Sequence, residues 1–178
     1  MITFIKAAFK NIGQTGSVME SSGYLSAKMI DTMDFEKPLH IVELGAGTGS
    51  ITKRLLEKMN DQSTLTSYEI DPELFEKLKK NNDKRLIEVN ADASLLRDHF
   101  KSQSVDYIIS GLPLANIPER KKASILDACH HVLKSGGYYI QFQYSLNDFR
   151  LLKRMFAKVD SCFTLRNLPP AFIYYAQK

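Results

Sequence analysis

Cysteine is scarce in this sequence, and long apolar runs are missing from it. The two cysteines, Cys129 and Cys162, are too few for a disulfide framework, and neither they nor the four histidines show the spacing of metal ligands. No apolar stretch approaches the roughly 20 residues that a membrane-spanning helix needs. Residues 1–14 carry lysines within their apolar stretch and lack the pattern of a cleaved signal peptide. These absences predict a protein of the reducing cytoplasm without a metal site.

The composition is that of a globular domain. The chain has 178 residues, of which 44% are hydrophobic and 25% are charged, which is enough for one domain with a full core. We expect a single domain over 1–178, with a helical cap over 1–37 and an α/β core over 38–178. The net charge of +4 suits a weakly anionic partner such as lipid head groups or nucleic acid, although many proteins without such partners are equally basic.

From about residue 38 onward, short β-branched runs alternate with amphipathic helical runs. We expect strands over 40–46, 64–71, 85–92, 105–113, 138–145, 161–168 and 171–177, and helices over 50–59, 72–82, 119–133 and 147–158. Such alternation predicts a doubly wound α/β fold, with a parallel sheet covered on both faces. The sequence KSGG at 134–137 is expected to end a helix. The last two strands have only Pro169 and Pro170 between them, so they should form an antiparallel hairpin.

The stretch IVELGAGTGSIT at 41–52 places three glycines directly after the first expected strand. Gly45, Gly47 and Gly49 follow a G-x-G-x-G spacing, which differs from the G-x-G-x-x-G of dinucleotide sites. In a doubly wound sheet, ligands bind beyond the carboxyl ends of the strands at the topological switch point. Because glycine permits a close backbone approach, we expect a ligand to lie against this loop.

Acidic residues end the first three expected strands and narrow the choice of ligand. Glu69 is placed where a carboxylate can accept hydrogen bonds from both hydroxyls of a ribose, and Asp92 where it can meet the amino group of an adenine. Glu43 is placed to attract a cation or an ammonium group. An adenosine with a short cationic amino-acid tail would satisfy all three acids, whereas a pyrophosphate would not. That ligand is S-adenosylmethionine.

The order of motifs VELGAGTGSIT, YEID, NADA and DYIISGLPL resembles that of the class I S-adenosylmethionine-dependent methyltransferases, over nearly the whole chain. The resemblance implies a Rossmann-like, seven-stranded mixed sheet with the strand order 3-2-1-4-5-7-6 and an antiparallel strand 7. It also implies that the product is S-adenosylhomocysteine. The cofactor-binding residues that it implies are Glu43, Gly45, Ala46, Gly47, Gly49, Glu69, Ile70, Asp92, Ala93 and Ser110.

The fourth strand should end at the methyl acceptor, where this sequence reads SGLPL at 110–114. Methyltransferases that act on the amino groups of adenine or cytosine have N-L-P-Y or D-P-P-Y there, with an amide or acid on the exocyclic amine and an aromatic ring on the flipped base. This sequence has Ser110 in place of the amide or acid, and Leu114 in place of the aromatic ring. Methylation of RNA adenine at N6 is therefore the weaker interpretation. It is not eliminated, because NIGQTG at 11–16 resembles the LGQNF of the ribosomal RNA dimethyladenosine transferases.

Three short motifs are similar instead to bacterial phospholipid N-methyltransferases: SGLPL, QFQYS at 141–145 and RNLPPAFIYYA at 166–176. This resemblance implies an N-methyltransferase that acts on phosphatidylethanolamine. A small-molecule amine methyltransferase and a non-catalytic binder of S-adenosylmethionine stay open as alternatives.

The transfer itself requires mainly alignment of the amine with the methyl group. We expect backbone carbonyls of Ser110, Gly111 and Leu112 to direct the amine. Desolvation beside the cationic sulfonium is expected to lower the pKa of the amine, so that it loses its proton without a dedicated base. Tyr24 and Tyr144 are candidates for a base or a head-group anchor, although each is more often a packing aromatic. Residues 21–23 are expected to form a loop that closes over the cofactor.

The N-terminal segment has an apolar face and a basic face. If residues 1–12 form a helix, Phe4, Ile5, Ala8, Phe9 and Ile12 share one side, while Lys6, Lys10 and Asn11 lie opposite. Such a helix suits the interface of an anionic membrane, and it equally suits docking on the protein's own sheet. The first alternative predicts peripheral association with the inner face of the cell membrane. The basic runs ERKK (119–122) and RLLKRMFAK (150–158) would add contacts there or form solvated helix faces.

Overall fold

The computed structural model describes the backbone of residues 16–165 and 170–178, and the side chains of this part from residue 23 onward. The amphipathic segment 1–12 and most of the NIGQTG motif lie outside the described residues, and so do residues 166–169 of the RNLPP motif. The expectations that concern them therefore stay predictions.

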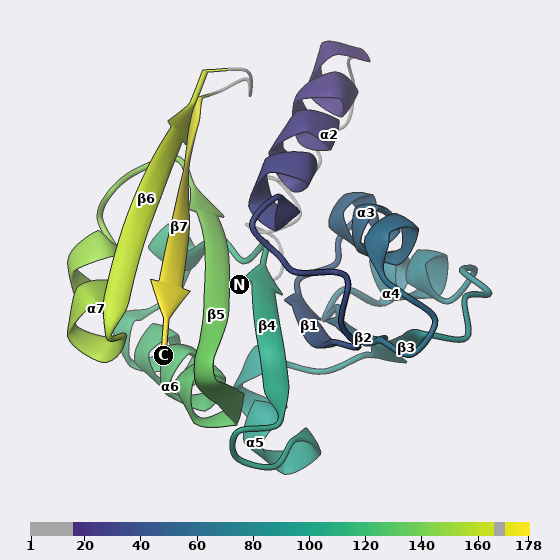
Figure 1. Ribbon diagram of the computed structural model, residues 1–178. Coiled ribbons are helices and arrows are strands. Elements are labelled where there is room, and N and C mark those ends of the chain that lie inside the picture. Colours follow the sequence, from purple (N-terminus) through teal and green to yellow (C-terminus); the bar gives the residue numbers. More distant parts are fainter. Residues whose placement is uncertain (1–15, 166–169) are drawn as a thin grey trace.

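Seven strands form one twisted sheet, which confirms the expected fold (Figure 1). The strand order is β3-β2-β1-β4-β5-β7-β6. β1 to β5 are mutually parallel, and β7 is antiparallel to both of its neighbours. The bounds are β1 His40–Leu44, β2 Thr64–Tyr68, β3 Leu86–Val89, β4 Val105–Ser110, β5 Leu133–Gln143, β6 Lys158–Thr164 and β7 Ala171–Gln177.

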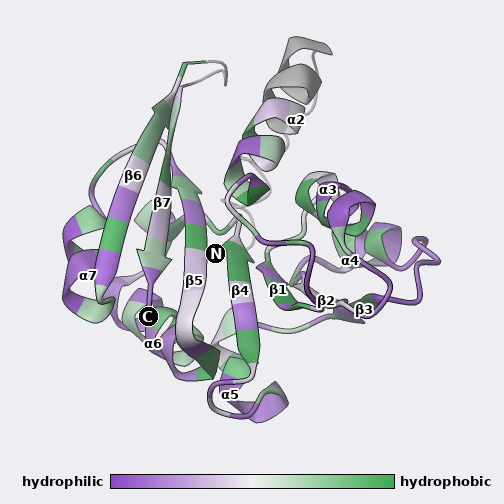
Figure 2. Cartoon of the chain, viewed as in Figure 1, coloured by the Kyte–Doolittle hydropathy of each residue, from purple (hydrophilic) through white to green (hydrophobic). Residues whose placement is uncertain are grey.

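Helices cover both faces of the sheet. The bounds are α2 Gly16–Ile30, α3 Ser50–Lys58, α4 Pro72–Leu78, α5 Leu96–His99, α6 Glu119–Val132 and α7 Phe149–Met155, with single 3-10 turns η1 Ala93–Leu95 and η2 Leu114–Asn116. Side chains of α2, α3 and α4 pack into one apolar cluster, and those of α5, α6 and α7 into the other. In Figure 2 the helices α3, α6 and α7 carry both hydrophobic and hydrophilic residues, as expected of helices that bury one face.

Alternate residues of each central strand enter opposite clusters. In β1, Val42 and Leu44 join the cluster under α5, α6 and α7, whereas Ile41 joins the cluster under α2, α3 and α4. This is the period of two that a strand imposes on its side chains. Burial on both sides accounts for the apolar runs at 41–42 in β1 and 107–109 in β4.

Several expected boundaries were wrong. Residues 21–23, expected as a closing loop, lie inside helix α2. The KSGG sequence does not separate a helix from a strand, because β5 starts at Leu133, immediately after α6. Its glycines instead form an irregularity in β5: Gly136 has a φ of 78°, and a Cβ on Gly137 would lie 2.9 Å from the Asp106 carbonyl oxygen. A glycine pair can mark a bulge as readily as a helix end. The helices η1 and α5 were not predicted from the sequence.

The hairpin expected near the end of the sequence is present, since β6 and β7 pair in antiparallel register from Lys158↔Gln177 to Thr164↔Ala171. The first of these strands starts three residues earlier than expected. Among the described residues, no helix is both long and apolar enough to cross a membrane.

Candidate functional site

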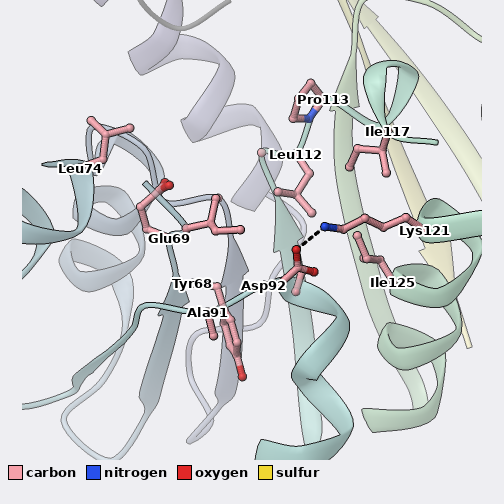
Figure 3. A pocket seen from close by; sticks show the side chains of 14 residues that line it. Tyr68, Glu69, Leu74, Ala91, Asp92, Leu112, Pro113, Ile117, Lys121 and Ile125 are labelled. Carbon is pink, nitrogen blue, oxygen red and sulfur yellow. Dashed lines mark hydrogen bonds and ion pairs between the residues drawn. The ribbon is translucent and has the colours of Figure 1, made fainter. Parts of the chain in front are cut away.

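A cavity lies at the carboxyl ends of β1 to β4, which is where the glycine loop was expected to bind a ligand (Figure 3). Each of the four strands contributes residues at its end, and α4 and α6 close two sides. The lining residues are Gly45, Tyr68, Glu69, Ile70, Leu74, Ala91, Asp92, Ala93, Gly111, Leu112, Pro113, Ile117, Lys121 and Ile125. Most of this wall is apolar, and its polar groups are few.

The glycine loop turns sharply over the end of β2. Gly45, Gly47 and Gly49 have φ values of 75°, 58° and 80°. Residues other than glycine rarely adopt this backbone conformation. The backbone N–H groups of Gly45 and Ala46 both donate to the carbonyl oxygen of Tyr68, at 2.9 and 3.0 Å. The loop is thus fixed to β2. Gly45 lines the cavity, whereas Ala46, Gly47 and Gly49 do not.

Glu69 connects the cavity to this loop. Its side chain is buried, Oε2 accepts from the N–H of Gly47 at 2.7 Å, and Oε1 accepts from the N–H of Asp71 at 2.8 Å. Each carboxylate oxygen has a second lone pair. Glu69 can therefore hold the loop and still accept hydrogen bonds from a ligand's hydroxyl groups.

Asp92 is paired with Lys121, which belongs to the basic run ERKK. We expected this run to form a solvated or a membrane-facing helix surface. One carboxylate oxygen accepts from the N–H and the hydroxyl of Ser94, and the other forms an ion pair with the Nζ of Lys121 (Figure 3). Burial raises the pKa of Asp92, but the hydrogen bonds from Lys121 and Ser94 outweigh it and hold the pKa below its usual value. The only sequence signal for an inward Lys121 is its place one helical turn before the buried Ile125.

Glu43 lies in β1 and does not line the cavity. Its carboxylate is fully buried: Oε2 accepts from the hydroxyls of Thr52 and Ser67, each at 2.6 Å. Within the described part of the chain, Oε1 has no hydrogen-bond partner. Burial raises the pKa of Glu43, although the two hydroxyls oppose this. A buried carboxylate oxygen without a donor suits either a proton or a nearby cation.

The segment after β4 forms the wall of the cavity next to the glycine loop. Ser110 is buried, and its Oγ accepts from the N–H of Leu112 at 3.3 Å. The carbonyl oxygen of Leu112 accepts from the side-chain Nε2 of Gln141 and from the N–H of Leu114, both at 2.9 Å. Both lone pairs of that carbonyl are therefore occupied, which is not the arrangement that an amine-directing carbonyl requires. Leu112 and Gly111 still line the cavity, whereas the side chains of Ser110 and Leu114 do not.

The two candidate tyrosines lie away from this cavity. Tyr24 is in α2, and Tyr144 follows β5, 45% exposed and edge-on to Phe142. Their suggested roles stay predictions. The phenol that does line the cavity, Tyr68, shares a hydrogen bond of 2.6 Å with Nδ1 of His99, and burial raises its pKa to about 12, so it is a poor base at neutral pH.

No cluster of metal-ligating side chains occurs among the residues with described placement. His130 packs edge-on against the ring of Phe156. The thiol of Cys129 is fully buried, which raises its pKa and makes it unreactive.

The geometry fits an adenosine with a cationic tail better than other nucleotides. Two carboxylates at adjacent strand ends, Glu69 and Asp92, have remaining acceptor capacity on the cavity side, and Ile70 and Ala93 add apolar surface. The described cavity wall has one cation, Lys121, and that cation is already paired with Asp92. A pyrophosphate would have no other positive side chain there to neutralise it.

Comparison with known proteins gives a consistent result. Residues 41–137 match a family described as a methyltransferase domain. The chain is 28% identical to the ornithine lipid N-methyltransferase of Singulisphaera acidiphila, across 98% of this chain and 94% of that protein. It is 33% identical to the ribosomal RNA small subunit methyltransferase A of Malacoplasma penetrans, across 63% of this chain and 40% of that protein.

Solved structures share the fold. The 1,6-didemethyltoxoflavin-N1-methyltransferase of Burkholderia thailandensis, with bound S-adenosylhomocysteine, superposes with a TM-score of 0.69 at 16% identity, covering 93% of this chain and 79% of that one. A SAM-dependent methyltransferase of Aquifex aeolicus gives a TM-score of 0.71 at 14% identity, with 96% of both chains covered.

Proposed function

Because the chain belongs to the methyltransferase domain family and takes S-adenosylmethionine as its methyl donor, we propose that its acceptor is a lipid amine. The proposed acceptor is the primary amine of a phospholipid head group of the phosphatidylethanolamine type, reached from the cytoplasm at the surface of the membrane. An ornithine lipid carries the same reacting group and is the other acceptor within this class. We propose the whole of 1–178 as one functional domain, with 1–37 on the membrane side.

The extent of the similarity supports a lipid acceptor. The ornithine lipid enzyme is matched along nearly its whole length, so the similarity includes the segments after β4 and β5 that lie beyond the cofactor motifs. The ribosomal RNA enzyme is matched over less than half of its length.

The single observation that carries the proposal is the acceptor wall after β4. This wall presents Leu112, Pro113 and Ile117 to the cavity, all aliphatic, while Leu114 is buried in the core. The wall therefore has neither the side-chain acceptor nor the stacking ring by which base-modifying enzymes hold a flipped base. A small aliphatic amine requires neither of them.

The chain's own residues chiefly bind and align. When bound, S-adenosylmethionine would supply the methyl group of its sulfonium: the amine nitrogen would bond to the methyl carbon as the carbon–sulfur bond breaks, and S-adenosylhomocysteine would leave as a thioether. In the proposed site Glu69 accepts from the ribose, Asp92 meets the adenine, and the backbone from Gly45 to Gly49 supports the tail. Alignment of this kind can lower a barrier by about 7–11 kcal/mol.

The acceptor amine must also lose a proton before it reacts. Among the lining residues, Glu69 accepts from two backbone N–H groups and Asp92 is paired with Lys121, so neither has the character of a general base. We propose that desolvation in the apolar cavity, beside a positive sulfonium, lowers the pKa of the amine sufficiently.

A second candidate function is methylation of RNA adenine at N6, which the ribosomal RNA relative favours. The experiment that separates the two offers labelled S-adenosylmethionine together with phosphatidylethanolamine vesicles, vesicles that contain an ornithine lipid, and bulk RNA. Label in either lipid fraction is the expected result. Label in RNA alone would refute the lipid proposal, and label in neither would point to a free amine or to a non-catalytic binder.

A further inference from the structure

One face of β5 carries a row of polar side chains inside the core. Tyr139, Gln141 and Gln143 point to the side covered by α6 and α7, and the side chains of Tyr139 and Gln141 are fully buried. A strand covered on both faces is normally apolar throughout, because a buried amide costs free energy unless each of its groups is hydrogen-bonded. Leucine at position 141 would fill the same place without that requirement.

The amide of Gln141 is held in one orientation. Its Oε1 accepts from the hydroxyl of Tyr139 at 2.6 Å, and its Nε2 donates to the carbonyl oxygens of Leu112 at 2.9 Å and Phe142 at 2.6 Å. Because the Tyr139 hydroxyl donates, the amide of Gln141 must turn its oxygen toward Tyr139. Its NH₂ group then points toward the carbonyl oxygen of Leu112. The two residues act in series on one backbone carbonyl.

That carbonyl belongs to the segment that forms the acceptor wall. On one side, the N–H of Gly111 donates to the carbonyl oxygen of Leu44 at 2.8 Å, which ties the segment to the start of the glycine loop. On the other side, Gln141 holds Leu112. Gly111 and Leu112 are thus fixed between the cofactor loop and β5, and both line the cavity.

We propose that Gln141 is a positioning residue for methyl transfer. It sets the place of the 111–112 segment relative to the glycine loop and so fixes the distance between the acceptor and the methyl donor, while Tyr139 sets the orientation of Gln141. Gln141 does not touch the cavity itself. The inference depends on the methyltransferase reaction and not on the identity of the acceptor.

The first test replaces Gln141→Leu and compares it with Gln143→Leu. Gln143 is a buried glutamine on the same face of the same strand, but its amide reaches Asp148, at 3.4 Å, and not the acceptor wall. Since a displacement of about 1 Å can cost a hundredfold in rate, Q141L should lower kcat by about tenfold to a hundredfold and change the dissociation constant of S-adenosylmethionine by less than about threefold. Q143L should lower the melting temperature but not kcat.

The second test uses the pH dependence of Gln141→Glu. A protonated glutamic acid can still donate to the Leu112 carbonyl, whereas a carboxylate cannot. Burial and two facing carbonyl oxygens raise the pKa of such a group. The ratio of the kcat of Q141E to that of the unmodified protein should therefore fall as pH rises, while cofactor affinity changes little. A purely structural glutamine would give a parallel loss of melting temperature and of cofactor affinity instead.

A third variant keeps the test valid if Q141L folds poorly. Tyr139→Phe leaves the glutamine in place but removes the hydroxyl that orients it, so kcat should fall by a smaller factor. In the double variant Y139F/Q141L the loss should be smaller than the product of the two single losses, because Tyr139 acts in part through Gln141.

These assays use whichever acceptor class takes label in the comparison of lipids and RNA. A further measurement needs no acceptor: it follows the amide hydrogen exchange of Leu114 in protein saturated with cofactor. The N–H of Leu114 donates to the same Leu112 carbonyl oxygen as Gln141 does. Faster exchange in Q141L than in Q143L is expected. Equal kcat in Q141L and the unmodified protein, or equal exchange in the two variants, would overturn the proposal.

Discussion

Gly111 faces Gly45 so closely that a Cβ on Gly111 would lie 3.0 Å from the carbonyl oxygen of Gly45. The first residue of the acceptor wall and the first residue of the glycine loop are therefore in backbone contact, without a side chain between them. A Cβ on Gly45 would in turn lie 3.1 Å from Cδ2 of Leu112. The cofactor side and the acceptor side of the cavity meet along this line.

Gly111→Ala should separate these two segments. The added methyl group meets backbone atoms that cannot rotate away, so we expect a stability loss of about 1–3 kcal/mol. The changed spacing should also lower kcat by more than about tenfold. Thermal unfolding and single-turnover methyl transfer measure the two effects. Gly23→Ala is a matched control, because a Cβ there meets only the end of the Arg54 side chain at 3.9 Å. Normal activity in G111A would show that the spacing tolerates adjustment.

Glu69→Ala should abolish binding of S-adenosylmethionine. The substitution removes the acceptor for the ribose and leaves the N–H of Gly47 without its present partner, so the glycine loop loses a hydrogen bond of 2.7 Å. Hydrogen bonds to charged groups contribute about 1.5–3 kcal/mol each, which predicts a loss of affinity of at least about a hundredfold. Calorimetry measures it, with Glu73→Ala on α4 as the control. Retained affinity would refute the placement of the ribose.

Lys121→Met should strengthen binding of the cofactor. In the present structure Lys121 occupies one oxygen of Asp92, and an adenine amino group would have to share or replace that contact. A partly exposed ion pair is worth up to about 1 kcal/mol, so the dissociation constant should fall by about two- to fivefold. Raising the salt concentration should have the same effect on the unmodified protein and none on the variant. Arg120→Met, at the exposed neighbouring position, controls for the lost charge. A weaker affinity in K121M would mean that Lys121 contacts the cofactor itself.

Glu43 should make the stability of the ligand-free protein depend on pH. Burial raises its pKa above the ordinary 4.5. The proton is therefore bound more tightly in the folded than in the unfolded protein, so stability is greatest below about 4.5 and is lost as pH rises through the pKa of the folded state.

Glu43→Gln removes this titration. The melting temperature of E43Q minus that of the unmodified protein should increase as pH rises above 4.5. The difference should become constant above the pKa that Glu43 has in the folded protein. Thermal unfolding across that range measures the difference. A constant difference at all pH values would mean that Glu43 stays in one protonation state.

Removal of residues 1–12 should weaken binding to vesicles that contain anionic lipid, if the segment lies in the membrane interface. Each basic residue near an anionic surface contributes about 1 kcal/mol. Lys6→Gln with Lys10→Gln should then lower binding to anionic vesicles by about tenfold or more, and binding to neutral vesicles much less. Vesicle flotation distinguishes these cases. Unchanged flotation of the truncated protein would assign the segment to internal packing.

The fold was predictable because its signals are local. Glycines after β1, acids at the ends of β2 and β3, and the alternation of apolar patterns each lie within a few consecutive residues, and together they identify the strand order through a family resemblance. The same signals placed Gly45, Glu69 and Asp92 around one cavity.

What the sequence did not predict depends on contacts between distant segments. ERKK has the composition of a solvated helix face, yet Lys122 is 3% exposed and its Nζ lies 2.6 Å from the buried carboxylate of Asp148. The engagement of the Leu112 carbonyl by Gln141 joins residues 29 positions apart. Helix α2 includes residues 21–23 because the following turn packs Leu25 and Met29 against the sheet, which outweighs the weak helix propensity of serine and glycine.

The position of β7 has a consequence for biosynthesis. β7 follows β6 in the sequence but lies between β5 and β6 in the sheet, so β6 has no neighbouring strand until β7 has been made. A chain that emerges from the ribosome with its N-terminal part first leaves the edge of β5 open during that time, and open strand edges promote association between chains. Tyr174 is the β7 residue that pairs with Gln141. β5, whose Gln141 holds the acceptor wall, therefore gains its second neighbouring strand only after β7 has been synthesised.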